Sequence, residues 1–181
     1  MAPSFALSSP SIKLYTTFIL VVFAFSTTAS HPCKETKMSV FFQDVATGPN
    51  ATVVAVAGIP GTTPGFLQYG SVFVSDDPIT ETIDKNSPEI ARGQGIYVTS
   101  SKDGLSTHLS VSIAFTNREY NGSTLELQGN SFQLADVREY AIVGGTGRFR
   151  FVKGYATLDT VFFDPSILYS VIRCNLTIRY D

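Results

Sequence analysis

Residues 137–155 read Val-Arg-Glu-Tyr-Ala-Ile-Val-Gly-Gly-Thr-Gly-Arg-Phe-Arg-Phe-Val-Lys-Gly-Tyr, and this stretch indicates the fold more clearly than any other. Two runs rich in apolar and aromatic residues flank a glycine-rich break at 144–147. This pattern predicts two strands joined by a tight turn, because glycine adopts positive φ at little cost. Arg138 opens the first run, and an arginine that points from a strand into a protein interior needs a counter-charge or a ligand.

The same strand pattern continues through most of the chain. Residues 109–116 alternate apolar with small or polar side chains, and Asn121-Gly122 is a typical hairpin turn. We expect strands at 38–46, 52–57, 66–75, 95–101, 105–116, 124–128, 137–143, 149–163 and 167–180. Short strands joined by hairpins predict an all-β antiparallel fold, and an eight-stranded barrel is favoured because closure removes exposed sheet edges. The stretches 58–65 and 77–88 are expected to be loops.

The first 30 residues have the composition of a secretory signal peptide. Lys13 precedes an apolar stretch at 14–25, and small residues follow it up to Ser30. The stretch is short for a membrane span, so a signal anchor is the less favoured alternative. Cleavage after Ala29 or Ser30 would leave residues 31–181 as a single domain in the extracellular space.

Three glycosylation sequons and two cysteines fit a secreted chain. The sequons begin at Asn50, Asn121 and Asn175, and each acceptor asparagine must face solvent. The two cysteines are Cys33 and Cys174. Secretion permits a disulfide between them, and the alternative is that Cys174 is a buried thiol.

The composition argues against several classes of function. The chain has 13 Lys and Arg against 15 Asp and Glu, and no basic cluster, so nucleic acid and anionic membranes are not expected as partners. His108 is the one histidine well inside the domain, which gives no basis for a zinc or other metal site or for a histidine-based triad. The glycine-rich segments lack the spacing of phosphate or dinucleotide loops, so no cofactor is expected.

Asp44, Tyr97 and Arg138 are the candidate site residues. Asp44 shares a strand face with Val40 and Phe42, so a buried Phe42 would bring the carboxylate inside. Burial raises the pKa of a carboxyl group unless a cation compensates, and Arg138 is the candidate cation. Tyr97 would add a phenol to the same interior. Alternatively, Asp44 caps a turn, Tyr97 packs in the core and Arg138 is exposed.

Five stretches resemble plant dirigent proteins and occur in the same order. They are Phe-Phe-Gln-Asp at 41–44, Gly-Ser-Val-Phe-Val-Ser-Asp-Asp-Pro-Ile-Thr at 70–80, Ala-Arg-Gly-Gln-Gly-Ile-Tyr at 91–97, Tyr-Asn-Gly-Ser-Thr-Leu at 120–125, and 138–155. The resemblance spans essentially all of 31–181. It implies an eight-stranded barrel of the dirigent and allene-oxide-cyclase type, secreted to the apoplast as a homo-oligomer, with a trimer favoured over a dimer.

The resemblance also implies a function. Dirigent proteins bind phenoxy radicals of monolignols such as coniferyl alcohol and steer their coupling into optically active lignans, while an external laccase or peroxidase is the oxidant. In this family an aspartate of the first strand and the arginine before the Gly-Gly-Thr-Gly turn line the pocket, and these match Asp44 and Arg138. Asp44 would act as a base and Arg138 would hold its charge, while Tyr97 and Phe42 would contact the substrate.

Two pocket positions depart from the lignan-forming members. This chain has Thr99 and Ser131 where those members carry a second tyrosine and a second aspartate, and both residues are expected to contact the substrate. The sequences at 120–123 and 137–139 are closer to another dirigent branch. That branch contains isoflavanol dehydratases that make pterocarpans by acid/base chemistry on a quinone methide. A stereodirecting protein without its own catalysis is favoured, and a dehydratase or cyclase is the alternative.

Overall fold

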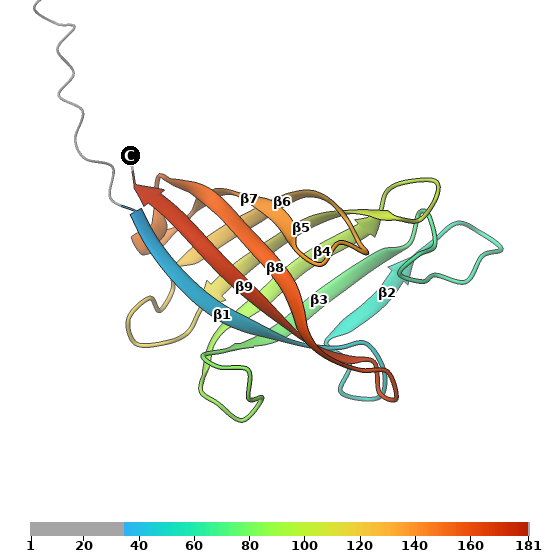
Figure 1. Cartoon of the computed structure of the whole chain (residues 1–181), viewed down its shortest axis with the longest axis horizontal. Helices are drawn as coiled ribbons and strands as arrows, with labels where there is room; N and C mark the ends of the chain where they lie inside the picture. The colour runs from blue at the N-terminus through green and yellow to red at the C-terminus, as the bar shows by residue number, and fades with distance from the viewer. Residues whose placement is uncertain (1–34, 181) are drawn as a thin grey trace, which may run out of the picture. The chain divides into compact units, whose positions relative to one another are not determined.

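The computed structural model describes residues 35–180, which fold as nine antiparallel β-strands and one short 3₁₀ helix (Figure 1). The elements are β1 (Glu35–Val45), β2 (Val53–Ala57), β3 (Val72–Thr80), β4 (Glu89–Thr99), β5 (Ser106–Phe115), β6 (Thr124–Phe132), β7 (Arg138–Gly145), η1 (Gly147–Phe149), β8 (Val152–Asp164) and β9 (Tyr169–Tyr180). Within residues 35–180 no helix has the length and apolarity needed to cross a membrane.

The strands form a single sheet that closes into a barrel. Their order is β1-β9-β8-β7-β6-β5-β4-β3-β2, and β1 also pairs with β3. β2 pairs with the first half of β3, whereas Phe41 and Phe42 of β1 pair with Thr80 and Ile79 at its far end. β1 and β2 therefore share one position beside β3, so the nine strands occupy eight positions around the barrel, which confirms the predicted architecture.

The boundaries of β3 and β4 differ from the strands predicted at 66–75 and 95–101. Residues 66–71 form turns, and β3 runs from Val72 to Thr80 through a stretch that was expected to be partly loop. Pro78 is tolerated in this strand because of the direction of its nitrogen. The backbone nitrogens of Asp76 and Pro78 point to the same side of β3, and the Asp76 N–H donates to the Thr52 carbonyl at 2.9 Å. At Pro78 the ladder to β2 has ended and the ladder to β1 has not begun, so no donor is required.

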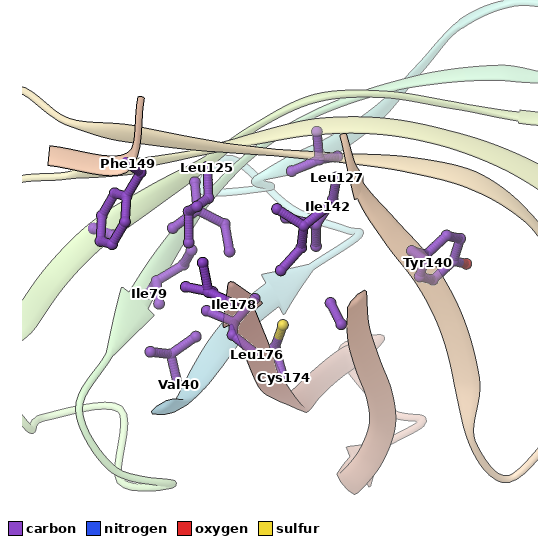
Figure 2. Packing of buried hydrophobic residues seen from close by; sticks show 14 of the residues in the cluster. Val40, Ile79, Leu125, Leu127, Tyr140, Ile142, Phe149, Cys174, Leu176 and Ile178 are labelled. Atoms are coloured by element: carbon purple, nitrogen blue, oxygen red, sulfur yellow. The ribbon is translucent and has the colours of Figure 1, made fainter. Parts of the chain in front are cut away.

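Buried hydrophobic side chains from most of the strands pack against one another inside the barrel (Figure 2). Along β9 the buried residues of this core are Cys174, Leu176 and Ile178, whereas Ile172 packs at the edge of the core and Ser170 lies further toward the other end. β1 repeats the pattern, since Val40 packs in the core and Asp44 lies four residues further along the same face of the strand. The core is thus concentrated at the end where β9 finishes, and the opposite end is left for other side chains.

The glycine-rich break at 144–147 closes this packed end. Gly144 and Gly145 still belong to β7, and the chain turns through η1, where Gly147 has a φ of +59°. The turn carries Phe149 into the core with none of its surface exposed. Its ring packs against Phe115 at a centroid distance of 5.2 Å and against Tyr120 at 5.1 Å.

The alternation along β9 also locates the last sequon. Cys174, Leu176 and Ile178 are buried inside, and Asn175 lies on the outer face, where its Oδ1 accepts a hydrogen bond of 2.7 Å from Ser39. The predicted signal peptide at 1–30 and Cys33 lie outside the described residues, so the disulfide to Cys174 stays a prediction. Cys174 itself is fully buried, and burial raises the pKa of its thiol.

Candidate functional site

A cavity of about 510 Å³ occupies the end of the barrel away from the packed core. Its wall is formed by apolar and aromatic side chains together with a small set of polar ones. The lining residues are Phe42, Asp44, Val53, Phe66, Ser75, Asp77, Tyr97, Thr107, Leu109, Val111, Leu127, Gln133, Leu134, Arg138, Tyr140, Leu158, Thr160, Phe163, Ser170 and Ile172. Its size and composition are those of a site for one small organic ligand.

Asp44 reaches this cavity by the alternation predicted from the sequence. Val40, Phe42 and Asp44 follow one another on the inner face of β1, and Phe42 is 6 % exposed. Burial raises the pKa of Asp44 to about 6, and the positive charge of Arg138 acts against this rise. The alternative that Asp44 caps an exposed turn is therefore wrong.

Arg138 lies in the same wall and keeps part of its hydrogen-bonding capacity free. Its Nη2 donates to Thr160 Oγ1 at 3.1 Å, while its Nε is buried and has no partner in the described part of the chain. No carboxylate among residues 35–180 lies at ion-pair distance from Arg138, so it influences Asp44 across the cavity. A buried guanidinium donor without a partner favours a ligand oxygen.

Tyr97 belongs to an aromatic wall on one side of the cavity. Its ring stacks on Phe73 at 4.7 Å with an interplanar angle of 7°, and Phe73 stacks on Phe66 at 4.8 Å. Phe66 and Tyr97 both line the cavity and lie 6.0 Å apart in nearly parallel planes. Burial, followed by the negative charges of Asp44 and Asp77, raises the pKa of Tyr97, so its phenol stays protonated.

Asp77 is a residue of the cavity wall that was not predicted from the sequence. It is 5 % exposed and lines the cavity, and its Oδ1 accepts a hydrogen bond of 2.6 Å from Thr52 Oγ1. Burial and then the charge of Asp44 raise the pKa of Asp77 to about 8. A signal was present, because continuing the alternation of Phe73 and Ser75 by one step turns Asp77 inward.

Thr99 and Ser131 do not take the places expected of them. Thr99 is fully buried outside the cavity wall, and its hydroxyl donates to the Phe66 carbonyl at 2.8 Å, which holds the segment carrying Phe66. Ser131 also lies outside the wall, and it shares a hydrogen bond with the hydroxyl of Tyr140, which does line the cavity. Both residues support wall residues, and Tyr140 was not predicted.

Gln133 ties together the loops around the cavity mouth. Its Nε2 donates to the carbonyl oxygens of Phe66 at 2.7 Å and Gly104 at 2.9 Å. Leu134 and Phe163 line the cavity beside these loops, although they are 62 % and 55 % exposed. The mouth is therefore apolar, which favours entry of a ligand with aromatic or aliphatic surface.

These features define what the site can do. Two buried carboxyl groups with raised pKa values can exchange protons near neutral pH, and Arg138 can hold an oxygen that develops negative charge. Among residues 35–180 no group of histidine, cysteine and acidic side chains is placed to hold a metal ion. The cavity therefore combines an aromatic binding wall with acid/base groups from its own side chains.

The model of the Dirigent-like protein family matches residues 35–179 of this chain. The chain belongs to the dirigent family. Dirigent protein 1 of Arabidopsis thaliana is 35 % identical, over 100 % of this chain and 97 % of that protein. Pterocarpan synthase 1 of Glycine max is 39 % identical over 67 % of this chain and 66 % of its own length.

Solved dirigent structures confirm the eight-stranded barrel. A pterocarpan synthase dirigent protein matches with a TM-score of 0.75 and 33 % identity, over 84 % of this chain and 88 % of that one. A second pterocarpan synthase dirigent protein matches with a TM-score of 0.73 and 34 % identity, over 82 % and 97 %. Both the family and the fold that the sequence predicted are thus confirmed.

Proposed function

We propose that this dirigent protein binds a phenolic intermediate in the barrel cavity and imposes stereochemistry on its reaction. The observation that carries the proposal is the placement of Asp44 and Arg138 in one cavity whose remaining wall is largely apolar and aromatic. We expect a phenolic ring to stack against the aromatic wall of Phe66 and Tyr97 and its oxygens to bind the polar groups of the cavity.

The first form of this function is stereoselective coupling of monolignol radicals such as those of coniferyl alcohol. Coupling of two radicals has little barrier, so the protein has only to restrict which faces meet. An external laccase or peroxidase makes the radicals. Asp44 then takes a proton from the coupled intermediate, and the free Nε of Arg138 holds the oxygen on which charge develops.

The second form is a dehydratase or cyclase that acts on an isoflavanol or a related precursor of a quinone methide. Asp77 favours it, because a second buried carboxyl group offers a proton donor beside the base Asp44. Similarity to pterocarpan synthases in sequence and in structure also supports it. In this form the protein is an enzyme and needs no oxidant.

One pair of assays distinguishes the two forms. Coniferyl alcohol with laccase should give an excess of one pinoresinol enantiomer if the protein steers coupling, and an isoflavanol without oxidant should lose water if it is a dehydratase. Asp44→Asn and Arg138→Ala should each abolish the activity that is found. Arg173→Ala is the control, because Arg173 pairs with Asp159 at 2.7 Å on the outer face. A racemic product together with no isoflavanol turnover would refute the proposal.

We also propose that the protein is a secreted apoplastic glycoprotein that assembles as a homotrimer, with a dimer as the alternative. Asn50 and Asn121 are exposed, which suits glycan attachment. Val54, Val74 and Ile96 lie side by side across β2, β3 and β4 on the outer face and are 46 %, 39 % and 45 % exposed. Such an apolar patch suits a subunit contact. Val74→Asp should yield monomers in analytical ultracentrifugation, and an unchanged sedimentation coefficient would contradict this.

A further inference from the structure

We propose that Asp77 is a proton donor of the cavity and that Thr52 is the positioning residue that keeps its proton on the oxygen facing the substrate. This inference rests on the second form of the proposed function, the dehydratase. It assigns roles to Asp77 of β3 and to Thr52, which immediately precedes β2, and these residues meet where the pairing partner of β3 changes from β2 to β1.

The two aspartates meet at a break in the β-ladder. β1 pairs with β3 through Phe42 and Ile79, and the ladder stops there. Continuing the same register by two residues would place Asp44 opposite Asp77, at the point where the strands separate and open the cavity. Two ionised carboxylates at opposed positions repel each other, so one of the pair retains its proton.

Hydrogen bonds around Thr52 decide where that proton lies. The Val45 N–H donates to Thr52 Oγ1 at 2.9 Å, so the hydroxyl accepts there and is free to donate its own hydrogen. The Asp77 Oδ1 acceptor lies at 2.6 Å, much closer than the Val45 carbonyl at 3.5 Å. Because Oδ1 accepts from Thr52, the proton of a neutral Asp77 is placed on Oδ2.

The surrounding charges favour the same arrangement. Besides Asp77, the ionisable groups in the cavity wall are Asp44 on β1, Tyr97 on β4, and Arg138 and Tyr140 on β7, while Asp76 and its partner Arg92 act from the outer face. The pKa of Asp44 is about 6 and that of Asp77 about 8, so the pair holds one proton between these pH values. The carboxylate is then Asp44, whose charge Arg138 favours.

This arrangement fits a phenol that carries a hydroxyl group on a benzylic carbon. Asp44 takes the phenol proton, the carbon–oxygen bond of the benzylic hydroxyl breaks, and the Asp77 proton joins the leaving hydroxide to form water. The ring is left as a quinone methide. A second phenolic hydroxyl of the same molecule then adds to the benzylic carbon and gives its proton to Asp77, while Asp44 returns its proton to the ring oxygen. Both carboxyl groups end as they began, and one water has been lost.

The test measures turnover of an isoflavanol with a second phenolic hydroxyl, without oxidant, by the full-length protein and its variants. Asp77→Asn keeps the shape but has no acidic proton, and its turnover should fall by about 100-fold or more. Thr52→Val should lower turnover by about tenfold and move the alkaline limb of the pH–rate profile upward. The shift is expected because the Thr52 hydrogen bond lowers the pKa of Asp77.

Two controls separate the hydroxyl of Thr52 from its sequon. Thr52→Ser keeps both the hydroxyl and the sequon and should behave like the wild type. Asn50→Gln removes only the sequon and should leave turnover and the pH profile unchanged. A Thr52→Val variant with the wild-type pH profile would overturn the positioning role.

The outcomes also separate this inference from the proposed function. Full turnover by Asp77→Asn, with turnover lost in Asp44→Asn, overturns the role of Asp77 and leaves the dehydratase standing. A wild type that gives enantiomeric excess from coniferyl alcohol but no isoflavanol turnover likewise overturns the inference, and leaves stereodirected coupling standing. If the wild type shows neither of the two activities, the proposed function itself is refuted.

Discussion

Replacing Asp77 by asparagine is expected to flatten the dependence of folding stability on pH. Burial raises the pKa of Asp77 from 3.8 to about 8, so at intermediate pH the folded protein keeps a proton that the unfolded chain has released. Linkage then makes the free energy of unfolding fall by about 1.4 kcal/mol per pH unit, or roughly 3 kcal/mol between pH 5 and 7. This contribution is complete below the unfolded pKa and disappears as the pH rises through the folded value. Asp77→Asn lacks it.

The measurement is urea unfolding of the wild type and Asp77→Asn at pH 5, 6 and 7, followed by circular dichroism because the chain has no tryptophan. Asp76→Asn is the matched control. Asp76 is an exposed neighbour whose pKa is lowered by its hydrogen bond from Arg92, so its effect on stability changes only at more acid pH. If the wild type and Asp77→Asn lose stability in parallel between pH 5 and 7, Asp77 does not hold a buried proton and the reasoning is wrong.

Other variants test the wall, the packed end and the mouth of the cavity. Gly93→Ala would place a Cβ 2.4 Å from Phe42 Cε1 and push that ring into the cavity. It should cost about 1–3 kcal/mol in urea unfolding and weaken calorimetric binding of coniferyl alcohol; unchanged binding would contradict the placement of Phe42. Phe149→Ala should cost about 3–5 kcal/mol yet leave binding intact, because Phe149 packs in the core and is not part of the cavity wall. Gln133→Ala removes the two hydrogen bonds that it donates to the loops at the mouth, so amides of residues 66–70 should exchange hydrogen faster at nearly unchanged melting temperature; equal exchange would show that the tie is unimportant.

The sequence predicts the barrel because apolar and polar side chains alternate along most strands and hairpin turns separate the strands. It also places Asp44 correctly, since Phe42 is inward and two residues later the chain faces the same way. Asp77 escaped prediction because Pro78 follows it, and a proline in a strand ordinarily marks a break. Here the missing N–H falls where β3 has no neighbour to receive it.

Other parts of the site depend on contacts between distant segments. The bond from Thr52 to Asp77 joins residues 25 positions apart, and that from Gln133 to Phe66 joins residues 67 apart. No local pattern encodes such pairs, because they follow from how the closed sheet brings loops together. Thr99 shows a related limit, because the resemblance to lignan-forming members predicts a substrate contact at this position, whereas the Thr99 hydroxyl holds the segment carrying Phe66.

Within residues 35–180 the packed core lies at one end of the barrel, so we expect reactant and product to pass through the apolar mouth at the other end. We expect the part of a molecule that enters first to lie against Phe42 and Leu127, which belong both to the cavity wall and to the packed core. The trailing part remains beside Leu134 and Phe163, at the open side. We therefore expect selectivity to be strict for the leading ring and permissive for the trailing part, so that substituents attached at the trailing end should be tolerated.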